Sequence, residues 1–180
     1  MTDVVIRLAE NQKDFETARS LCREWLDWHW RNYPTDWPKG PDHPMDPVTF
    51  EATIQELPSI HKPPSGGVLV GVLNGEAVGC VMYNEAKSGI AEFNRLFVNE
   101  KGRGHRMGHR MLEAMFVQLS ANGCQKVFFS SATFLTHARA MYEAAGFVKM
   151  PHPSDFPKEW RDYTYFMERA LSRTQNQTFS

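Results

Sequence analysis

The sequence lacks a Cys-x-x-Cys pair and any long run of apolar residues. Its three cysteines, Cys22, Cys80 and Cys124, are scattered and odd in number, which argues against a zinc ribbon and a disulfide framework. Free thiols are typical of a reducing compartment, so we expect a cytoplasmic protein. Acidic residues appear early in the chain, and no apolar stretch is long enough to span a bilayer. We therefore expect neither a signal peptide nor a membrane partner.

The sequence also has no excess of charge of either sign. Its 20 Lys and Arg residues and 21 Asp and Glu residues give a formal net charge of −1. Nothing in the whole-chain charge predicts binding to nucleic acid. The length of 180 residues suits one domain. We expect this domain to span residues 1–171, followed by a frayed tail over residues 172–180.

Hydrophobic periodicity predicts an α/β (α+β) domain with a mixed central sheet of about six to seven strands. We expect a helix capped by Asp14, a second helix from Asp46-Pro47 to near Pro58, and further helices over about 104–121 and 136–145. Strands are expected over 4–8, 68–72, 77–83, 90–98, 127–131, 147–150 and 163–168. Asn74-Gly75 is a hairpin turn, because both positions need positive φ. Hairpins followed by strand–helix–strand units indicate a sheet flanked by helices.

A basic, glycine-rich segment lies between a predicted strand and a predicted helix. Residues 101–110 read KGRGHRMGHR, with four cations, two histidines and no acid. A helix N-terminus has unpaired backbone N–H groups, and glycine lets a phosphate approach them closely. Cations at this end oppose the helix dipole by about 0.3–1 kcal/mol each, so helix stability alone would favour acids. The segment therefore predicts a pyrophosphate cradle, and a solvated basic turn is the alternative.

Other ligand motifs fit this segment less well. The GxxxxGK[ST] pattern is absent, and the glycine spacing is off by one from the GxGxxG dinucleotide fingerprint. No acid ends the following strand to hold a ribose, which weakens the alternative of a nucleotide-binding oxidoreductase. His105 and His109 are four residues apart, but Arg106 replaces the Glu of HExxH and no third ligand is evident. We therefore expect no metal site.

Two motifs in this order resemble the GNAT superfamily of acyltransferases. The family's turn is usually [QR]-x-x-G-x-[GA] after a strand ending like R-L-Y-V, and here Arg95-Leu96-Phe97-Val98 precedes residues 103–108. Residues 138–147, ARAMYEAAGF, are similar to the family's A-x-x-L-Y-E-x-x-G-F. The resemblance runs from about Val68 to Glu168. Arg106 stands where the family usually has glycine, and Leu135 where many members carry asparagine.

This resemblance implies a splayed sheet with the pantetheine arm of acetyl-CoA, the co-substrate, lying in the splay. The core over residues 67–169 would bind acetyl-CoA, and residues 1–66 would shape the acceptor side. The backbone of Leu96, Phe97 and Val98 would bond to the arm like an added strand. Backbone amides of the turn would hold the pyrophosphate, through Arg103, Gly104, His105, Arg106, Met107 and Gly108.

The implied function is an N-acetyltransferase that moves the acetyl group directly to a primary amine of a small molecule or peptide. The alternative is a catalytically silent CoA-binding or regulatory domain of the same fold, because fold does not establish activity.

Two residues are candidates for proton transfer. Glu92 matches the position of a catalytic glutamate in some family members, and a partly buried Glu can act as a base directly or through water. Strand alternation would place Glu92 and Asn94 on one face with Leu96 and Val98. Tyr142 matches the tyrosine whose hydroxyl approaches the coenzyme sulfur, and is the candidate acid. A Glu92 carboxylate paired with an arginine and a Tyr142 packed in the core are the structural alternatives.

Aromatic residues crowd the first helix and the loop that follows it. They are Trp25, Trp28, Trp30, Tyr33 and Trp37, with His29 among them. A core stripe accounts for only some of these residues. An aromatic wall for an apolar or cationic acceptor, a homodimer contact and packing over the sheet edge are the alternatives for the rest. The acceptor is not identified by the sequence.

Overall fold

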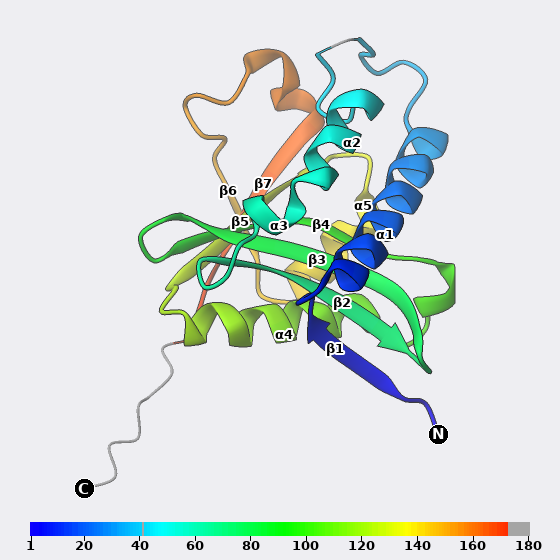
Figure 1. Cartoon of the computed structure of the whole chain (residues 1–180). Coiled ribbons are helices and arrows are strands. Elements are labelled where there is room, and N and C mark those ends of the chain that lie inside the picture. Colours follow the sequence, from blue (N-terminus) through cyan, green and yellow to red (C-terminus); the bar gives the residue numbers. More distant parts are fainter. Residues whose placement is uncertain (41, 173–180) are drawn as a thin grey trace, which may run out of the picture.

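The structure, a computed structural model, describes residues 1–40 and 42–172 and forms a seven-stranded sheet with helices on both faces (Figure 1). The helices are α1 (Gln12–Asn32), α2 (Pro47–Gln55), α3 (Leu57–Ile60), α4 (Met107–Ala121) and α5 (Thr136–Ala144), with 3-10 turns η1 (Glu100–Gly102) and η2 (Lys158–Tyr163). The strands are β1 (Val4–Leu8), β2 (Gly66–Leu73), β3 (Glu76–Lys87), β4 (Ile90–Val98), β5 (Lys126–Ala132), β6 (Val148–Met150) and β7 (Thr164–Ala170). The predicted single domain with a mixed sheet is confirmed, whereas residues 173–180 of the predicted tail lie outside the described residues.

The strand order is β1-β2-β3-β4-β5-β7-β6. Neighbouring strands are antiparallel except β4 and β5, which are parallel because α4 crosses between them. Asn74 and Gly75 join β2 to β3 with φ values of 50° and 83°. The predicted hairpin turn is therefore confirmed.

The starts of α1 and α4 differ from the predicted ones. Asn11, not Asp14, caps α1, because its side chain accepts a hydrogen bond from the Asp14 N–H at 2.9 Å. Asp14 is buried in the first turn, where its carboxylate pairs with Arg7. α4 begins at Met107, later than predicted, because Arg106 occupies its N-cap in a left-handed conformation with φ 55°.

Buried apolar side chains form one cluster on each face of the sheet. Neighbouring β3 residues alternate between the clusters, with Val81 in one and Cys80 in the other. The first cluster lies under α4 and α5, and the second lies under α1, α2 and α3; Figure 1 shows α4 across the sheet from α1 and α2. The inner face of α4 is fully buried, with Met107, Met111, Leu112, Met115 and Leu119 each at most 1% exposed.

A bulge interrupts β4. Two of its residues, Arg95 and Leu96, stand opposite Val81 alone, because the register passes from Met82–Asn94 to Cys80–Phe97. Arg95 has φ 53°, a conformation that costs a non-glycine residue about 1–2 kcal/mol. The extra residue shifts the alternation of every side chain that follows it.

The bulge changes which face the end of β4 presents. Phe93 packs in the cluster under α4, so its neighbours Glu92 and Asn94 point to the opposite face. Beyond the bulge, Leu96 and Val98 also pack against the cluster under α4. The prediction that Glu92, Asn94, Leu96 and Val98 share one face is therefore wrong. The bulge places the first two on the α1 side and the last two on the α4 side.

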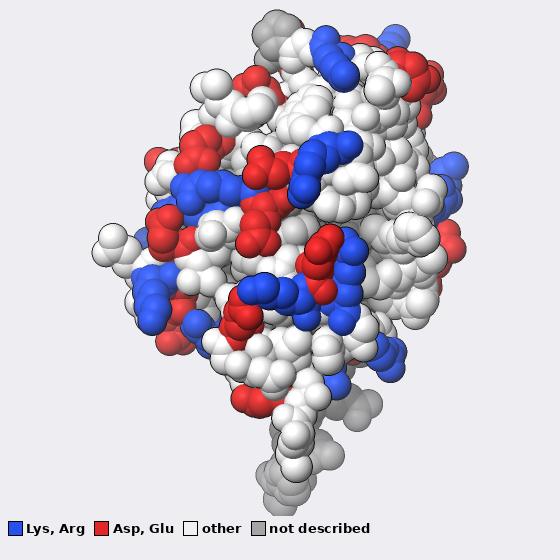
Figure 2. All heavy atoms as spheres, turned by 90° about the vertical axis from the view of Figure 1, so that its right-hand side faces the viewer, with Lys and Arg blue, Asp and Glu red and all other residues white. Residues whose placement is uncertain are grey.

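Charges of both signs cover the surface. On the face in Figure 2, lysine and arginine side chains are interspersed with aspartate and glutamate. Some of these residues are paired, such as Arg23 with Glu51 at 2.8 Å and Lys126 with Glu168 at 3.3 Å. Within the described ranges, no helix is long and apolar enough to cross a membrane.

Candidate functional site

The sheet opens beyond the first residues of β4. β4 and β5 are paired only through Ile90–Glu92 and Lys126–Phe128, although β4 continues to Val98. β5 stays paired with β7 along its whole length, so β4 and β5 separate after these three pairs. No described strand therefore pairs with β4 on this edge over residues 93–98. The splay that the family resemblance implies is present.

Val98 directs its backbone polar groups into this opening. The Asn99 N–H donates to the Val78 carbonyl at 2.8 Å, so these two residues form a hydrogen-bonded antiparallel pair. Directly opposed pairs alternate between bonded and non-bonded, so the neighbouring pair of Val98 and Gly79 is non-bonded. The Val98 N–H therefore points away from β3 and toward β5. It can donate to a carbonyl that lies in the opening.

The turn between β4 and α4 presents free helix amides to the same opening. Its N-cap residue, Arg106, makes no side-chain hydrogen bond to the helix in the described structure. The first N–H groups of a helix lack intrahelical acceptors and carry the positive end of the helix dipole. This helix end can therefore bind an anion without displacing a side-chain cap.

Three glycines of this turn differ in their surroundings. A Cβ on Gly102 would lie 2.6 Å from Val98 Cγ1, and one on Gly108 would lie 2.8 Å from Met141 Sδ. Gly102 is therefore needed for packing, whereas the atom beside Gly108 belongs to a flexible methionine side chain that can shift. A Cβ on Gly104 would meet no described atom within 4 Å, although the φ of Gly104 is +79°. The space beside Gly104 belongs to the cavity and permits the close approach that a phosphate needs.

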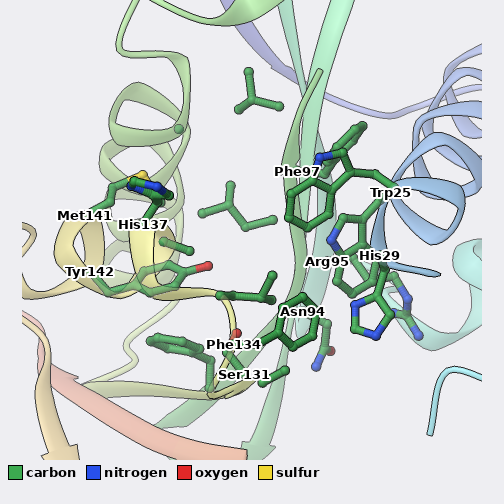
Figure 3. A pocket seen from close by; sticks show the side chains of 18 of the residues that line it. Trp25, His29, Asn94, Arg95, Phe97, Ser131, Phe134, His137, Met141 and Tyr142 are labelled. Carbon is green, nitrogen blue, oxygen red and sulfur yellow. The ribbon is translucent and has the colours of Figure 1, made fainter. Parts of the chain in front are cut away.

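A cavity of about 760 Å³ joins the glycine turn, the opening in the sheet and α1. This volume is typical of small-molecule sites. In Figure 3, Tyr142, Met141 and His137 lie on one side of the cavity, and Trp25 and His29 lie on the other. The two sides correspond to the α4–α5 face and the α1 face of the sheet. The cavity therefore passes through the sheet at the splay and is open to both layers.

Tyr142 lies on α5 and points its hydroxyl into the cavity (Figure 3). The side chain is buried, and its ring packs against Phe93, Phe129 and Phe147 at centroid distances of 5.9, 4.2 and 6.0 Å. Burial raises the pKa of Tyr142 well above its usual range. The hydroxyl is therefore protonated at neutral pH and can donate a hydrogen bond to a group in the cavity. The predicted core packing of the ring is observed, and the hydroxyl faces the cavity, whereas the role of proton donor stays a prediction.

Glu92 lies beside the cavity but does not line it. Asn94, two residues later on the same face, does line it. Burial raises the pKa of Glu92, and the nearby Asn94 and Arg95 act in the opposite direction. No ion pair within 4.0 Å joins Glu92 to any cation of the described chain, so the predicted alternative of an arginine-paired carboxylate is not observed.

Aromatic rings surround the α1 side of the cavity, which we call the aromatic chamber. Its rings are Trp25, Trp28, His29, Tyr33, Trp37, His43, Phe134, Trp160 and Tyr163. They contact one another, for example Phe134 with His29 at 5.2 Å and with Trp37 at 5.3 Å between ring centroids. Trp30 is the exception among the predicted aromatics: it does not line the cavity, and its indole N–H donates to the Met45 carbonyl at 3.0 Å.

The sequence did not predict four rings of the chamber, which are those of His43, Phe134, Trp160 and Tyr163. Phe134 follows β5, and Trp160 and Tyr163 belong to η2. Only Tyr163 falls in a predicted strand, and no pattern in the sequence signals that these rings meet α1. A clue was available in the length of irregular chain between residues 150 and 163, because long loops often carry functional residues.

His29 is the buried polar group of the aromatic chamber. It is 4% exposed, yet neither ring nitrogen has a hydrogen-bond partner among the described residues. Burial, with a smaller effect of His43, lowers the pKa of His29 to about 4, so the ring is neutral at pH 7. Buried polar side chains are normally hydrogen-bonded. Each nitrogen also has less than 1 Å² of accessible surface, so neither of them faces the cavity in this structure.

The formal charges that line the cavity are all positive. They belong to Arg95, Arg103 and Arg106, and no aspartate or glutamate of the described residues lines it. Burial lowers the pKa of Arg95, whose guanidinium lies 5.8 Å from the centre of the Phe50 ring. Across residues 1–40 and 42–172, no group of three or more His, Cys, Asp or Glu side chains could hold a metal ion.

Most of the predicted site residues meet at this cavity. Those that line it are Leu96, Phe97, Val98, Arg103, Gly104, Arg106, Met107, Gly108 and Tyr142, whereas Glu92 and His105 do not. Leu135 also lines the cavity and contributes an apolar side chain at the start of α5.

Comparison with known proteins gives one family and many similar structures. The model of the acetyltransferase (GNAT) family matches residues 22–147. An acetyltransferase of the GNAT family from Staphylococcus aureus Mu50 is 14% identical with a TM-score of 0.73, and the match covers 94% of this chain and 100% of that chain.

Two further structures show the same fold. PaiA N-acetyltransferase from Thermoplasma acidophilum, solved in complex with coenzyme A, is 14% identical with a TM-score of 0.69, over 94% of this chain and 99% of that chain. The ribosomal-protein-S18-alanine N-acetyltransferase from Escherichia coli is 14% identical with a TM-score of 0.65, over 99% and 100% of the two chains. A search of curated proteins finds no match.

Proposed function

Because this chain belongs to the GNAT family of acetyltransferases and is therefore an acyltransferase, we propose that it transfers an acetyl group directly from acetyl-CoA to a primary amine. The acceptor is a small molecule or a peptide. The observation that carries the proposal is the opening between β4 and β5, which leads to the uncapped N-terminus of α4. It offers a free strand edge and an anion site in one continuous cavity.

The residues around the opening fit the parts of acetyl-CoA. The free edge of β4 at Leu96, Phe97 and Val98 would pair with the amides of the pantetheine arm. The pyrophosphate would lie against the turn from Arg103 to Gly108, with Gly104 leaving room for it. His105 does not line the cavity, so only its backbone amide is assigned to the cradle. Coenzyme A in the Thermoplasma acidophilum structure supports this choice of co-substrate.

Direct transfer assigns one proton step to each catalytic candidate. The amine nitrogen attacks the thioester carbonyl carbon, and the Val98 N–H donates to the carbonyl oxygen as negative charge develops there. The carbon–sulfur bond then breaks, and Tyr142 donates its proton to the leaving thiolate. Glu92 accepts the proton that the amine nitrogen loses. We assign this step to a bridging water, because Glu92 does not line the cavity.

Binding of the co-substrate tests the first part of the proposal. We expect acetyl-CoA to raise the melting temperature and CoA to compete with it in calorimetric titration. Absence of binding at millimolar CoA would refute the proposal.

Turnover tests the second part. The position of Glu92 outside the cavity lining favours one alternative, a silent CoA-binding domain. Thiol release from acetyl-CoA, measured with a broad panel of amines, distinguishes an active acetyltransferase from a silent CoA-binding domain. Tight CoA binding without release on any amine would establish the silent domain.

A further inference from the structure

The bulge in β4 directs the side chain of Arg95 to the α1 side of the sheet. Strict alternation after Asn94 would direct the Arg95 side chain to the α4 face instead. Its guanidinium lies 5.8 Å from the centre of the Phe50 ring, and its Nη1 lies 3.9 Å from Met82 Sδ. Phe50 and Met82 both belong to the cluster under α1, α2 and α3. The strained backbone at Arg95, with φ 53°, therefore adds an arginine to the face that already carries Asn94.

The Arg95 guanidinium has little in the protein to bind. It can donate five hydrogen bonds, and among residues 1–40 and 42–172 it makes one, to the weak acceptor Met82 Sδ. No carboxylate of these residues lies within 4.0 Å of it, and Glu92 attracts it only from a greater distance. Charged side chains are rarely removed from water without an ion-pair partner. Most donors of this arginine are therefore left for another molecule.

This cation lines the cavity. Arg95 is half-buried, so part of its surface is accessible, and it lies on the same side of the cavity as Trp25 and His29 (Figure 3). Solvent can hydrate the guanidinium as long as the aromatic chamber is open. A ligand that fills the chamber excludes this solvent and leaves the charge without a partner, which is costly. A ligand with an anionic group removes that cost, whereas a neutral or purely cationic ligand does not.

The chemistry of the chamber favours a carboxylate on an apolar body. The planar fork of a guanidinium matches the two oxygens of a carboxylate in a bidentate pair. Arg95 is a single cation, which balances one carboxylate better than the double charge of a phosphate monoester. The rest of the wall consists largely of aromatic rings, such as Trp37 and Tyr163 at 4.8 Å between centroids. Such rings favour contact with a large apolar group.

We propose that Arg95 binds the carboxylate of the acceptor, and that the acceptor is an amino acid with a large apolar side chain. The inference rests on the proposed transfer of an acetyl group to an amine and narrows the class of acceptor. The product is then an N-acetyl amino acid whose carboxylate stays paired with Arg95. Arg95 determines specificity and takes no part in the proton steps, which stay assigned to Glu92 and Tyr142.

A matched pair of acceptors tests the role of the carboxylate. L-phenylalanine and L-phenylalaninamide differ at the carboxyl group alone, and thiol release from acetyl-CoA is the readout. We expect kcat/KM for the acid to exceed that for the amide by about tenfold to 100-fold, although the amine of the amide loses its proton more readily. Equal or faster transfer to the amide would overturn the inference and leave the proposed acetyl transfer standing.

Glycine tests the apolar body. It supplies the amine and the carboxylate without a side chain, so its kcat/KM should be about tenfold or more below that of phenylalanine. Equal turnover of glycine would overturn the assignment of a large apolar side chain.

Calorimetry distinguishes failure of the inference from failure of the function. Phenylalanine and phenylalaninamide are each titrated into CoA-saturated protein, which needs no turnover. Tighter binding of the acid would support the assignment of Arg95 even if no acetyl group is transferred. Equal or tighter binding of the amide would overturn it, whether or not acetyl-CoA is turned over.

Variants of Arg95 test whether this residue recognises the carboxylate. Arg95→Gln should lower the acid-to-amide ratio of kcat/KM to about one, without changing the KM for acetyl-CoA. A purely structural role would lower both turnovers and leave the ratio unchanged, and that result would overturn the assignment. Arg95→Lys keeps the charge without the bidentate fork and should restore part of the preference.

The matched control is Arg106→Gln. Arg106 also lines the cavity and has positive φ, at 55°, but it lies at the N-terminus of α4, where the co-substrate is proposed to bind. This variant should keep the acid-to-amide ratio of the unmodified protein, whatever it does to CoA binding. An equal loss of the ratio in both variants would overturn the assignment of the carboxylate to Arg95.

Discussion

Acidification should destabilise this protein through two buried histidines before its carboxylates titrate. His29 lies in the aromatic chamber, and His61 lies under β3, where its Nδ1 is 3.1 Å from the Tyr83 carbonyl oxygen. Burial is the main cause that lowers the pKa of each to about 4 from a reference value of 6.5. His43, which contacts His29 at 6.5 Å between ring centroids, also has a pKa lowered by burial. All three rings favour the neutral form in the folded protein.

The size and sign of the effect follow from these pKa values. Below pH 6.5 the unfolded chain binds protons that the folded protein does not bind until about pH 4, so stability falls as the pH falls through this window. Each of His29 and His61 should remove about 2 kcal/mol from the free energy of unfolding between pH 7 and pH 5. Together the two histidines remove about 4 kcal/mol from the free energy of unfolding. This is a large share of the roughly 5–15 kcal/mol that is typical of small domains.

Urea unfolding at pH 7 and pH 5 measures this loss directly. His29→Phe and His61→Phe should each reduce the difference between the two pH values by about 2 kcal/mol, whatever they do to stability at pH 7. The double variant should remove both contributions, because the two sites are separate. An unchanged pH dependence in His29→Phe would show that the ring is charged or solvated in the folded protein.

The remaining predictions concern the co-substrate and the proton steps. Gly104 and Gly123 both have positive φ and open space where an added Cβ would lie, so changing either glycine to alanine should lower stability by about 1–2 kcal/mol. Only Gly104→Ala should also weaken CoA binding in calorimetry, by about tenfold. Equal CoA affinities of the two variants would mean that the phosphates bind elsewhere. Arg103→Ala should weaken CoA by about tenfold at low salt and less at high salt, and no change would remove Arg103 from the cradle. Glu92→Gln should lower kcat by about 10²–10⁴-fold at neutral pH and less at high pH, where the free amine is deprotonated. Tyr142→Phe should cost less and show no rescue by pH; equal, pH-independent losses would mean that neither residue moves a proton.

The fold was predictable because its local signals agree. Strand alternation, the Asn74-Gly75 turn and the apolar stripe of α4 each indicate the same element order. The bulge at Arg95 was not predictable, since neither of its two residues, Arg95 and Leu96, is a glycine or a typical turn residue, and an arginine with positive φ is held there by the tertiary structure. This one extra residue is the reason that the predicted face of β4 was wrong.

The site was predictable where backbone geometry defines it and not where distant side chains do. The proposed cradle from Arg103 to Gly108 is one continuous segment, and its charges conflict with helix stability, so the sequence predicts a ligand there. The aromatic chamber joins α1 to Phe134 and Trp160, which only the folded chain brings together. The burial of His29 without a hydrogen-bond partner among the described residues is likewise invisible in the sequence, because a histidine among aromatics reads as an ordinary core residue.

The short pairing of β4 with β5 has a mechanical consequence. The sheet consists of two panels, β1–β4 and β5–β7–β6, whose backbones are joined along a seam of three residue pairs. Beyond the seam the panels are held by side chains, such as Phe93 against Phe129 at 4.5 Å between ring centroids. A strand-like ligand lying in the opening would bridge the panels where the backbone does not. The number of residue pairs between β4 and β5 therefore sets the size of the opening. One additional pair would begin to close the opening at the end next to Glu92 and Phe128.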